Sequence, residues 1–433
     1  MGGEISAGGR QHLEFAEHPL RRGLANEVHA RPYELLRAPV RASHVAVLGD
    51  GGDRERVAAL CARFSVAPPE AEANYLSADF GGFRLRWERH AEFSTFTVFR
   101  LGDGLDPFAD TALAALPAGW LADLEGVLVA MHVAVMPGDQ PTPDLSRLFA
   151  GHQVIGSRVQ GGAAEAWTDF RLHGDGFGRV LVRDHGLTPG QTGRLVQRLL
   201  EIETYRMMAL LAFPLAREAA PKLSRIDDAL SDIVARMAEG ARDDDDRPLL
   251  DRLTRLAAEC EQVSATTSFR LSAARAYDAI VRQRIEELRE ERIPGLQTIG
   301  EFMGRRLAPA MNTCRSTAER QDALAARVAR AGSLLRTRVD IALEEKNRDL
   351  LRSMNRRARL QLRLQETVEG LSVVAISYYV VGLVGYAAKG AKAAGTPVDP
   401  DIAVLAALPL VVGLVWLGVR RLRRALGHGG EDG

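Results

Sequence analysis

The stretch VEGLSVVAISYYVVGLVGYAAKG, residues 368–390, decides the fold that the sequence predicts. Within it, residues 371–388 carry no charged side chain, and a second uncharged run, residues 402–419, follows after a short loop. Each run has about 18 residues, roughly 27 Å of helix, at the short end for a bilayer span. Two such runs can also form a buried core hairpin. Because both come last in the chain, with charges on their flanks, we expect a two-helix transmembrane hairpin.

Charged residues around the two runs predict their orientation. Arginines precede the first run and follow the second: Arg356, Arg357, Arg359 and Arg363 before it, and Arg420, Arg421, Arg423 and Arg424 after it. The loop 389–401 balances two lysines with two aspartates. The positive-inside rule then places this loop outside and both chain ends, including the basic tail 420–433, in the cytoplasm. We expect a multi-pass protein of the bacterial inner membrane, with the lipid bilayer as its partner.

The residues before the hairpin predict an α+β cytosolic domain followed by a long-helix, coiled-coil-like region. Residues 1–17 are glycine-rich without periodicity and are expected to be disordered. Residues 18–187 mix helical patterns with strand patterns such as SHVAVLGD (43–50), FRLRWERHAEFSTFTVFRL (83–101), LEGVLVAMHVAVM (124–136) and the hairpin at 164–184. From the N-cap Thr188 to residue 370 the pattern is almost all helical and rich in Arg and Glu, which is typical of a helical bundle and stalk.

Composition excludes several classes of protein. The 433 residues are enough for two or three domains, and Lys plus Arg equals Asp plus Glu, so charge gives no reason to expect nucleic acid as a partner. The three cysteines are far apart and form no CxxC pair, which argues against a zinc cluster. No nucleophile–base pair and no G-x-S-x-G elbow is present, so we expect neither an enzyme nor a cofactor.

One heptad stripe on the helix that enters the membrane is small or hydroxylated. Its membrane part consists of Ser372, Ala375, Tyr379, Gly382 and Tyr386, at alternating spacings of four and three. If several copies pack around an axis, this face lines a pore. Small and hydroxylated residues are also enriched at dry contacts between membrane helices, so ordinary helix packing is the simpler interpretation of the stripe. Either way we expect self-association through the stalk and the first membrane helix.

Two polar clusters are candidate binding sites. Glu27, His29 and Arg31 alternate in ANEVHARP (25–32) and would share one face of an extended segment, as an acid–base pair, a metal site or an anion site requires. The simpler interpretation is a hydrogen-bonded clamp that ties this segment to the domain. The run Asp243, Asp244, Asp245 and Asp246 could gather a divalent cation, although most acidic runs between helices are solvated linkers.

Several segments resemble a bacterial family catalogued as domain-of-unknown-function family 3422. They are LANEVHARP (24–32), SHVAVLGD (43–50) and KNRDLLRSMNRRARLQLRLQETVEGLSVVAISYYVVGLVGY (346–386). The resemblance covers nearly the whole chain, and it implies no particular activity.

The predicted layout also resembles CorA-type magnesium channels. These have a cytosolic α/β domain, a long stalk helix that continues into the first span, a short outer loop, a second span and a basic tail. The resemblance implies a pentamer whose first span lines the pore. Such channels carry Gly-Met-Asn at the outer end of that span, where this sequence reads VGYAAKG (384–390). The missing motif counts against magnesium selectivity.

Two functional hypotheses follow from the sequence. The first is an oligomeric, CorA-like ion channel or transporter with the Ser372–Tyr386 face toward the pore. The second is a membrane-anchored cytosolic binding or scaffold module that transports nothing. The sequence identifies neither an ion nor a small ligand.

Overall fold

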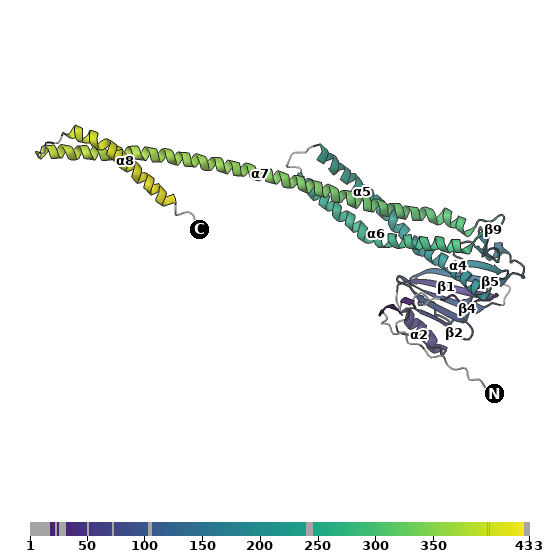
Figure 1. The fold of residues 1–433 in the computed structure, drawn as a ribbon. Helices are drawn as coiled ribbons and strands as arrows, with labels where there is room; N and C mark the ends of the chain where they lie inside the picture. The colour runs from purple at the N-terminus through teal and green to yellow at the C-terminus, as the bar shows by residue number, and fades with distance from the viewer. Residues whose placement is uncertain are drawn as a thin grey trace, which may run out of the picture. The chain divides into compact units, whose positions relative to one another are not determined.

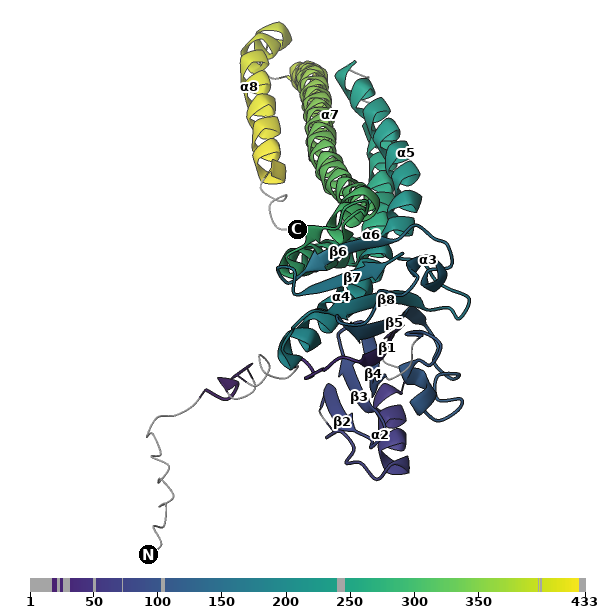
Figure 2. The ribbon, with the colours of Figure 1, turned by 90° about the vertical axis from the view of Figure 1, so that its right-hand side faces the viewer.

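Eight strands from the N-terminal half of the chain and one short strand from farther along it form one mixed nine-stranded sheet. The computed structural model describes residues 18–427 except 22, 23, 26–31, 50, 51, 72, 103–105, 240–245, 396 and 398. The strands are β1 (Val40–Leu48), β2 (Tyr75–Asp79), β3 (Arg84–Arg89), β4 (Phe93–Leu101), β5 (Val127–Pro137), β6 (Ile155–Val159), β7 (Ala164–Thr168), β8 (Gly178–Asp184) and β9 (Glu291–Arg292). Their order across the sheet is β2-β3-β4-β1-β5-β8-β7-β6-β9, and Figure 2 shows the first eight of them in this order. Each neighbouring pair is antiparallel except β5 and β8, which are parallel.

Each face of the sheet is covered by a helix. Alternate residues of a strand point to opposite faces, so Val45 and Val47 of β1 pack on α2 (Asp53–Arg63), together with Leu85 and Trp87 of β3. The opposite face includes Val40 and Ala42 and packs on α4 (Pro189–Leu210), as the views from two sides show (Figures 1 and 2). A short 3-10 helix (Ala112–Ala115) and the four-residue α3 (Leu145–Leu148) lie in the connections.

The start of α4 is fixed by a capping box. Thr188 is the N-cap, Pro189 is the first helical residue, and the Gln191 side chain accepts a hydrogen bond from the Thr188 backbone N–H at 2.8 Å. This arrangement satisfies backbone donors that the first helical turn leaves free. The N-cap expected from the sequence is therefore confirmed, and α4 starts at a defined residue over the sheet.

Long helices make up most of the remaining chain. They are α5 (Ala212–Ala238), α6 (Asp246–Leu288), α7 (Ile299–Ala393) and α8 (Pro400–Gly427). The main hydrophobic core joins the sheet and α4 to α5, α6 and the first part of α7 through residues such as Ala212, Leu271 and Met303. Contacts divide the chain into two compact units, one from residues 1–239 and 251–332 and the other from residues 240–250 and 333–433.

In the part of the chain that the structure describes, two helices are long and apolar enough to cross a membrane. They are the C-terminal part of α7 and residues 400–421 of α8, and only 11% and 6% of their apolar windows are buried. Large apolar side chains such as Leu371, Leu383 and Leu405 are exposed. A water-exposed apolar surface of this extent is rare in a soluble monomer. The α+β domain, the long helices and this C-terminal pair confirm the fold class that the sequence predicts.

Candidate functional site

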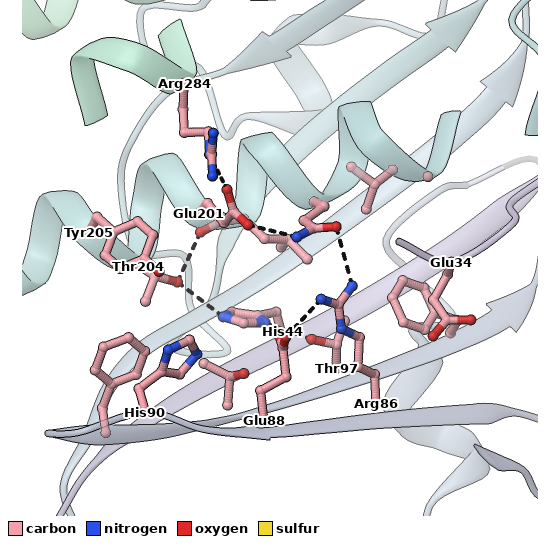
Figure 3. A pocket seen from close by; sticks show the side chains of 17 residues that line it. Glu34, His44, Arg86, Glu88, His90, Thr97, Glu201, Thr204, Tyr205 and Arg284 are labelled. Atoms are coloured by element: carbon pink, nitrogen blue, oxygen red, sulfur yellow. Dashed lines mark hydrogen bonds and ion pairs between the residues drawn. The ribbon is translucent and has the colours of Figure 1, made fainter. Parts of the chain in front are cut away.

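A polar cavity lies between the sheet and α4. Its volume is about 260 Å³, and β1, β3 and β4 form its floor while α4 forms its roof (Figure 3). The side chains that line it include Glu34, His44, Arg86, Glu88, Thr95, Thr97, Gln197, Glu201, Thr204 and Arg284. A cavity of this size accommodates a molecule smaller than a nucleotide.

A continuous series of hydrogen bonds connects polar and charged side chains across the cavity. Arg86 of β3 donates to Glu88 at 2.8 Å and, through its other terminal nitrogen, approaches the Gln197 amide oxygen at 3.4 Å. Gln197 donates to Glu201 at 2.7 Å, and Glu201 also accepts a hydrogen bond from Arg284 of α6. Burial opposes the charge on Arg284, but the adjacent Glu201 and Glu287 carboxylates outweigh it and raise the pKa of the guanidinium.

Within this series of hydrogen bonds, Arg86 gives the strongest indication of a ligand. Its side chain is 5% exposed, so its charge is removed from bulk water. Among the described residues, its Nε and the Thr95 hydroxyl, both on residues that line the cavity, lack hydrogen-bond partners. A buried polar atom without a partner is costly, typically about 1–3 kcal/mol. Such atoms beside a cavity are the groups that a polar ligand would satisfy.

His44 lies on the floor of the cavity in a single protonation state. The Thr204 hydroxyl donates to the Leu200 carbonyl, so it can only accept from His44, which carries its proton on Nε2. The other ring nitrogen, Nδ1, then accepts from the Thr97 hydroxyl at 2.8 Å. Burial first, and then the charges of Arg86 and His90, lower the pKa of His44 to about 3. His44 is a neutral histidine with both ring nitrogens bonded, and it is unavailable for proton transfer near neutral pH.

The sequence placed candidate sites elsewhere. Glu27, His29 and Arg31 lie outside the described residues, as do Asp243, Asp244 and Asp245. Asp246 is described: it begins α6, is buried, and pairs with Arg338 of α7 at 3.4 Å. Glu34, shortly after the first cluster, borders the cavity and accepts a hydrogen bond from the Ser77 hydroxyl at 2.5 Å.

The stripe expected to enter the membrane lies on an exposed face of α7. Ser372, Ala375, Tyr379, Gly382 and Tyr386 are all exposed. A different face, which includes Ser377 and Ala388, is buried. On that face, a Cβ added at Gly385 would lie 3.1 Å from Val404 of α8, whereas one added at Gly382 would meet no atom within 4 Å. Within one chain the stripe therefore does not serve the packing of the two helices.

A signal for the cavity is visible in the sequence once the fold is known. Arg84, Arg86 and Glu88 alternate along β3, which on its own predicts a solvent-facing side of a strand. Gln197, Glu201 and Thr204 form a polar stripe at spacings of four and three on α4. Each set of polar residues alone fits exposure to water. Together they contribute to the floor and the roof of the polar cavity.

Comparison with models of known protein families shows to which family the chain belongs. A family model described as a protein of unknown function, DUF3422, matches residues 16–426. The chain belongs to the DUF3422 family. The match spans the sheet, the long helices and most of the C-terminal pair, so the whole architecture of this DUF3422 protein lies within the family. No curated protein and no solved structure matches it.

Proposed function

We propose that this DUF3422 protein is a membrane-anchored binding module whose α+β domain takes a small polar ligand in the cavity under α4. The observation that carries this proposal is the buried Arg86 on the floor of the cavity, whose Nε has no hydrogen-bond partner among the described residues. A buried cation that is only partly paired contributes little to stability, so a role in binding accounts for it better. The arginines that flank the apolar helices support a cytoplasmic position for the domain.

The charges of the cavity define the class of ligand. Arg86 is surrounded by carboxylates, with Glu88 bonded to it and Glu34 and Glu201 on the same cavity. A ligand that carries both an anionic and a cationic group would be complementary to this lining. The ligand is therefore a small zwitterion of about amino-acid size. The neutral, fully bonded His44 favours binding over catalysis.

The substitution Arg86→Met tests this function. Full-length protein is purified in detergent and denatured, and the released small molecules are identified by mass spectrometry. The wild type should release one zwitterionic species, and Arg86→Met should bind it about 10–100-fold more weakly, because a charge-assisted hydrogen bond is lost. The matched control is Arg158→Met on β6, where the side chain is 51% exposed.

Two results would refute the binding module. The first is a wild-type protein that releases no small molecule and is not stabilised by any amino acid in a thermal-shift panel. The second is equal retention of the released molecule by Arg86→Met and by the wild type, with circular dichroism showing that both are folded.

A second function, an oligomeric channel of CorA-like layout, is favoured by one separate observation. The stripe that includes Ser372 and Tyr379 is exposed and is not used against α8. A tyrosine hydroxyl near the middle of an apolar span needs a polar partner or water. Other copies of the same helix, or a water-filled axis between them, would supply it. This proposal requires several copies in one particle.

A further inference from the structure

A cluster of histidine and carboxylate side chains lies outside the cavity, at the loop between β7 and β8. We infer that His152, Asp169 and His173 form a binding site for a divalent transition-metal ion, with Zn²⁺ the best-fitting ion. One ligand atom from each residue lies within 4.8 Å of the others. Asp169 and His173 follow β7, and His152 lies between α3 and β6. Neither the cavity under α4 nor the membrane stripe shares a residue with this site.

The spacing of the ligand atoms suits a metal ion. His152 Nδ1 lies 2.7 Å from Asp169 Oδ2, and His173 Nε2 lies 3.1 Å from the same oxygen. Ligand atoms of a tetrahedral zinc site, at bonds near 2.0 Å, lie about 3.3 Å apart. Small movements of the two imidazole rings away from Asp169 would therefore reach coordination geometry.

The hydrogen bonding of His173 is the second observation that points to a ligand. Its side chain is only 3% exposed. Its Nε2 is close enough to Asp169 for an ion pair, but the approach does not have the geometry of a hydrogen bond, and Nε2 has no hydrogen-bond partner among the described residues. A buried imidazole nitrogen without a partner is a rare and costly feature. A metal ion held jointly with Asp169 would occupy its lone pair.

The buried charge of Asp169 leads to the same conclusion. Its side chain is fully buried, and in the described part of the chain no arginine or lysine forms an ion pair with it. A carboxylate buried with only two histidines as its charged neighbours is expensive to keep ionised, and a divalent cation would compensate it. The second carboxylate oxygen, Oδ1, accepts from the Arg171 backbone N–H at 3.1 Å, which would hold the ligand in its orientation.

The set of ligands selects the class of ion. Two imidazoles and one carboxylate suit Zn²⁺ and related transition metals, whereas Ca²⁺ and Mg²⁺ prefer oxygen ligands throughout. Three protein ligands leave a fourth position, and the His152 side chain is 31% exposed, so that position is accessible to water or to another ligand. The alternative is a plain His–Asp–His hydrogen-bonded bridge between two loops.

The test uses full-length protein in detergent, purified without a histidine tag, stripped with a chelator and titrated with Co²⁺ and then with Zn²⁺. We expect one ion per chain and a visible Co²⁺ spectrum of tetrahedral type, displaced by Zn²⁺. His152→Gln should weaken binding by about 100-fold, at least as much as loss of an outer-shell partner costs. His152 is the suitable position because its partial exposure makes the substitution tolerable for the fold.

The matched control is His185→Gln. His185 is also a partly exposed histidine beside a carboxylate, 3.1 Å from Glu165, but in the described part of the chain these two residues belong to no group of three potential metal ligands. This variant should bind Co²⁺ like the wild type. Two outcomes overturn the site. The first is a wild type that binds neither Co²⁺ nor Zn²⁺ more tightly than His152→Gln does, which would leave the metal-free bridge. The second is a His185→Gln variant that loses as much affinity as His152→Gln. If His152→Gln fails to fold, the wild-type protein alone tests the site: a Co²⁺ spectrum of tetrahedral type supports it, and the absence of that spectrum refutes it.

Discussion

His44 is buried, and both nitrogens of its ring are hydrogen-bonded. Thr97 and Thr204 occupy its two nitrogens, and the Leu200 carbonyl fixes which of them carries the proton. A protonated ring would lose the hydrogen bond from Thr97 and would lie near Arg86 and His90, so the charged form is strongly disfavoured. The neutral state is therefore part of the native structure of the cavity floor.

This residue predicts a loss of stability in mild acid. The pKa of His44 is 6.5 in the unfolded chain and about 3 in the folded domain, so between these values only the unfolded chain takes up the proton. The free energy of unfolding falls as the pH falls, and His44 alone contributes about 2 kcal/mol between pH 7 and pH 5. His44→Gln should remove that part of the pH dependence, as measured by urea unfolding followed by tryptophan fluorescence.

The free energy of unfolding of His44→Gln should still fall to some extent between pH 7 and pH 5. His132 is also buried, which lowers its pKa to about 4, so it adds a loss of the same sign. An unchanged difference between pH 7 and pH 5 in His44→Gln would show that His44 is charged in the folded state.

At the scale of elements, the position of α4 depends on one glycine. Gly193 lies in the first turns of α4, and a Cβ at this position would lie 1.7 Å from the Glu34 carbonyl oxygen. The same segment is attached to the start of α4 by the hydrogen bond from the Leu36 N–H to the Pro189 carbonyl at 3.1 Å. Only a residue without a side chain allows the helix and this segment to approach so closely.

Gly193→Ala should therefore lower stability by about 3 kcal/mol, because the helix or the Glu34 segment must move. Gly304→Ala in α7 is the matched control: it is also a helical glycine, but an added Cβ meets no atom within 4 Å. There alanine should raise stability by up to about 1 kcal/mol through helix propensity. Thermal melts of the two variants should move in opposite directions, and a shared direction would contradict the close approach.

The sequence predicts elements better than it predicts their faces. The strands of β1, β3, β4 and β5 and the hairpin of β7 and β8 follow local alternation and turn residues, so they are found without the structure. The two-residue β9 is not found, because it pairs with β6 across more than a hundred residues and lies in a break between helices. The cavity is missed for a related reason: whether Arg86 and Glu201 face water or each other depends on where α4 lies.

The same limit applies to the cluster at the β7–β8 loop. The hairpin AEAWTDFRLHGDGFGRVLVRD (164–184) is expected from the sequence with its turn at Gly174–Gly178, and Asp169 and His173 lie before that turn without a distinguishing signal. His152 is separated from them by β6 and β7, and no standard spacing of metal ligands connects the three. Only the antiparallel pairing of β6, β7 and β8 brings them together.

At the scale of the whole molecule, the exposed stripe on α7 raises the question of assembly. The two candidate functions differ here, because a binding module works as a single chain whereas a channel needs an axis surrounded by several copies. The two glycines of the span lie on different faces: Gly385 is close to Val404 of α8, and Gly382 is in open space. The same bulky substitution at each therefore separates packing within the chain from packing between chains.

We expect the mass of the detergent-solubilised particle, corrected for bound detergent, to be a multiple of the 47.1 kDa chain if the stripe is a contact between copies. Gly382→Ile should then reduce the mass toward that of one chain, because its side chain enters the contact between helices. Gly385→Ile should instead destabilise the pair of α7 and α8 and lower the yield of folded protein, whatever the number of copies. A wild-type particle of one chain, or a Gly382→Ile particle of unchanged mass, removes the contact on which a pore depends and leaves the binding module.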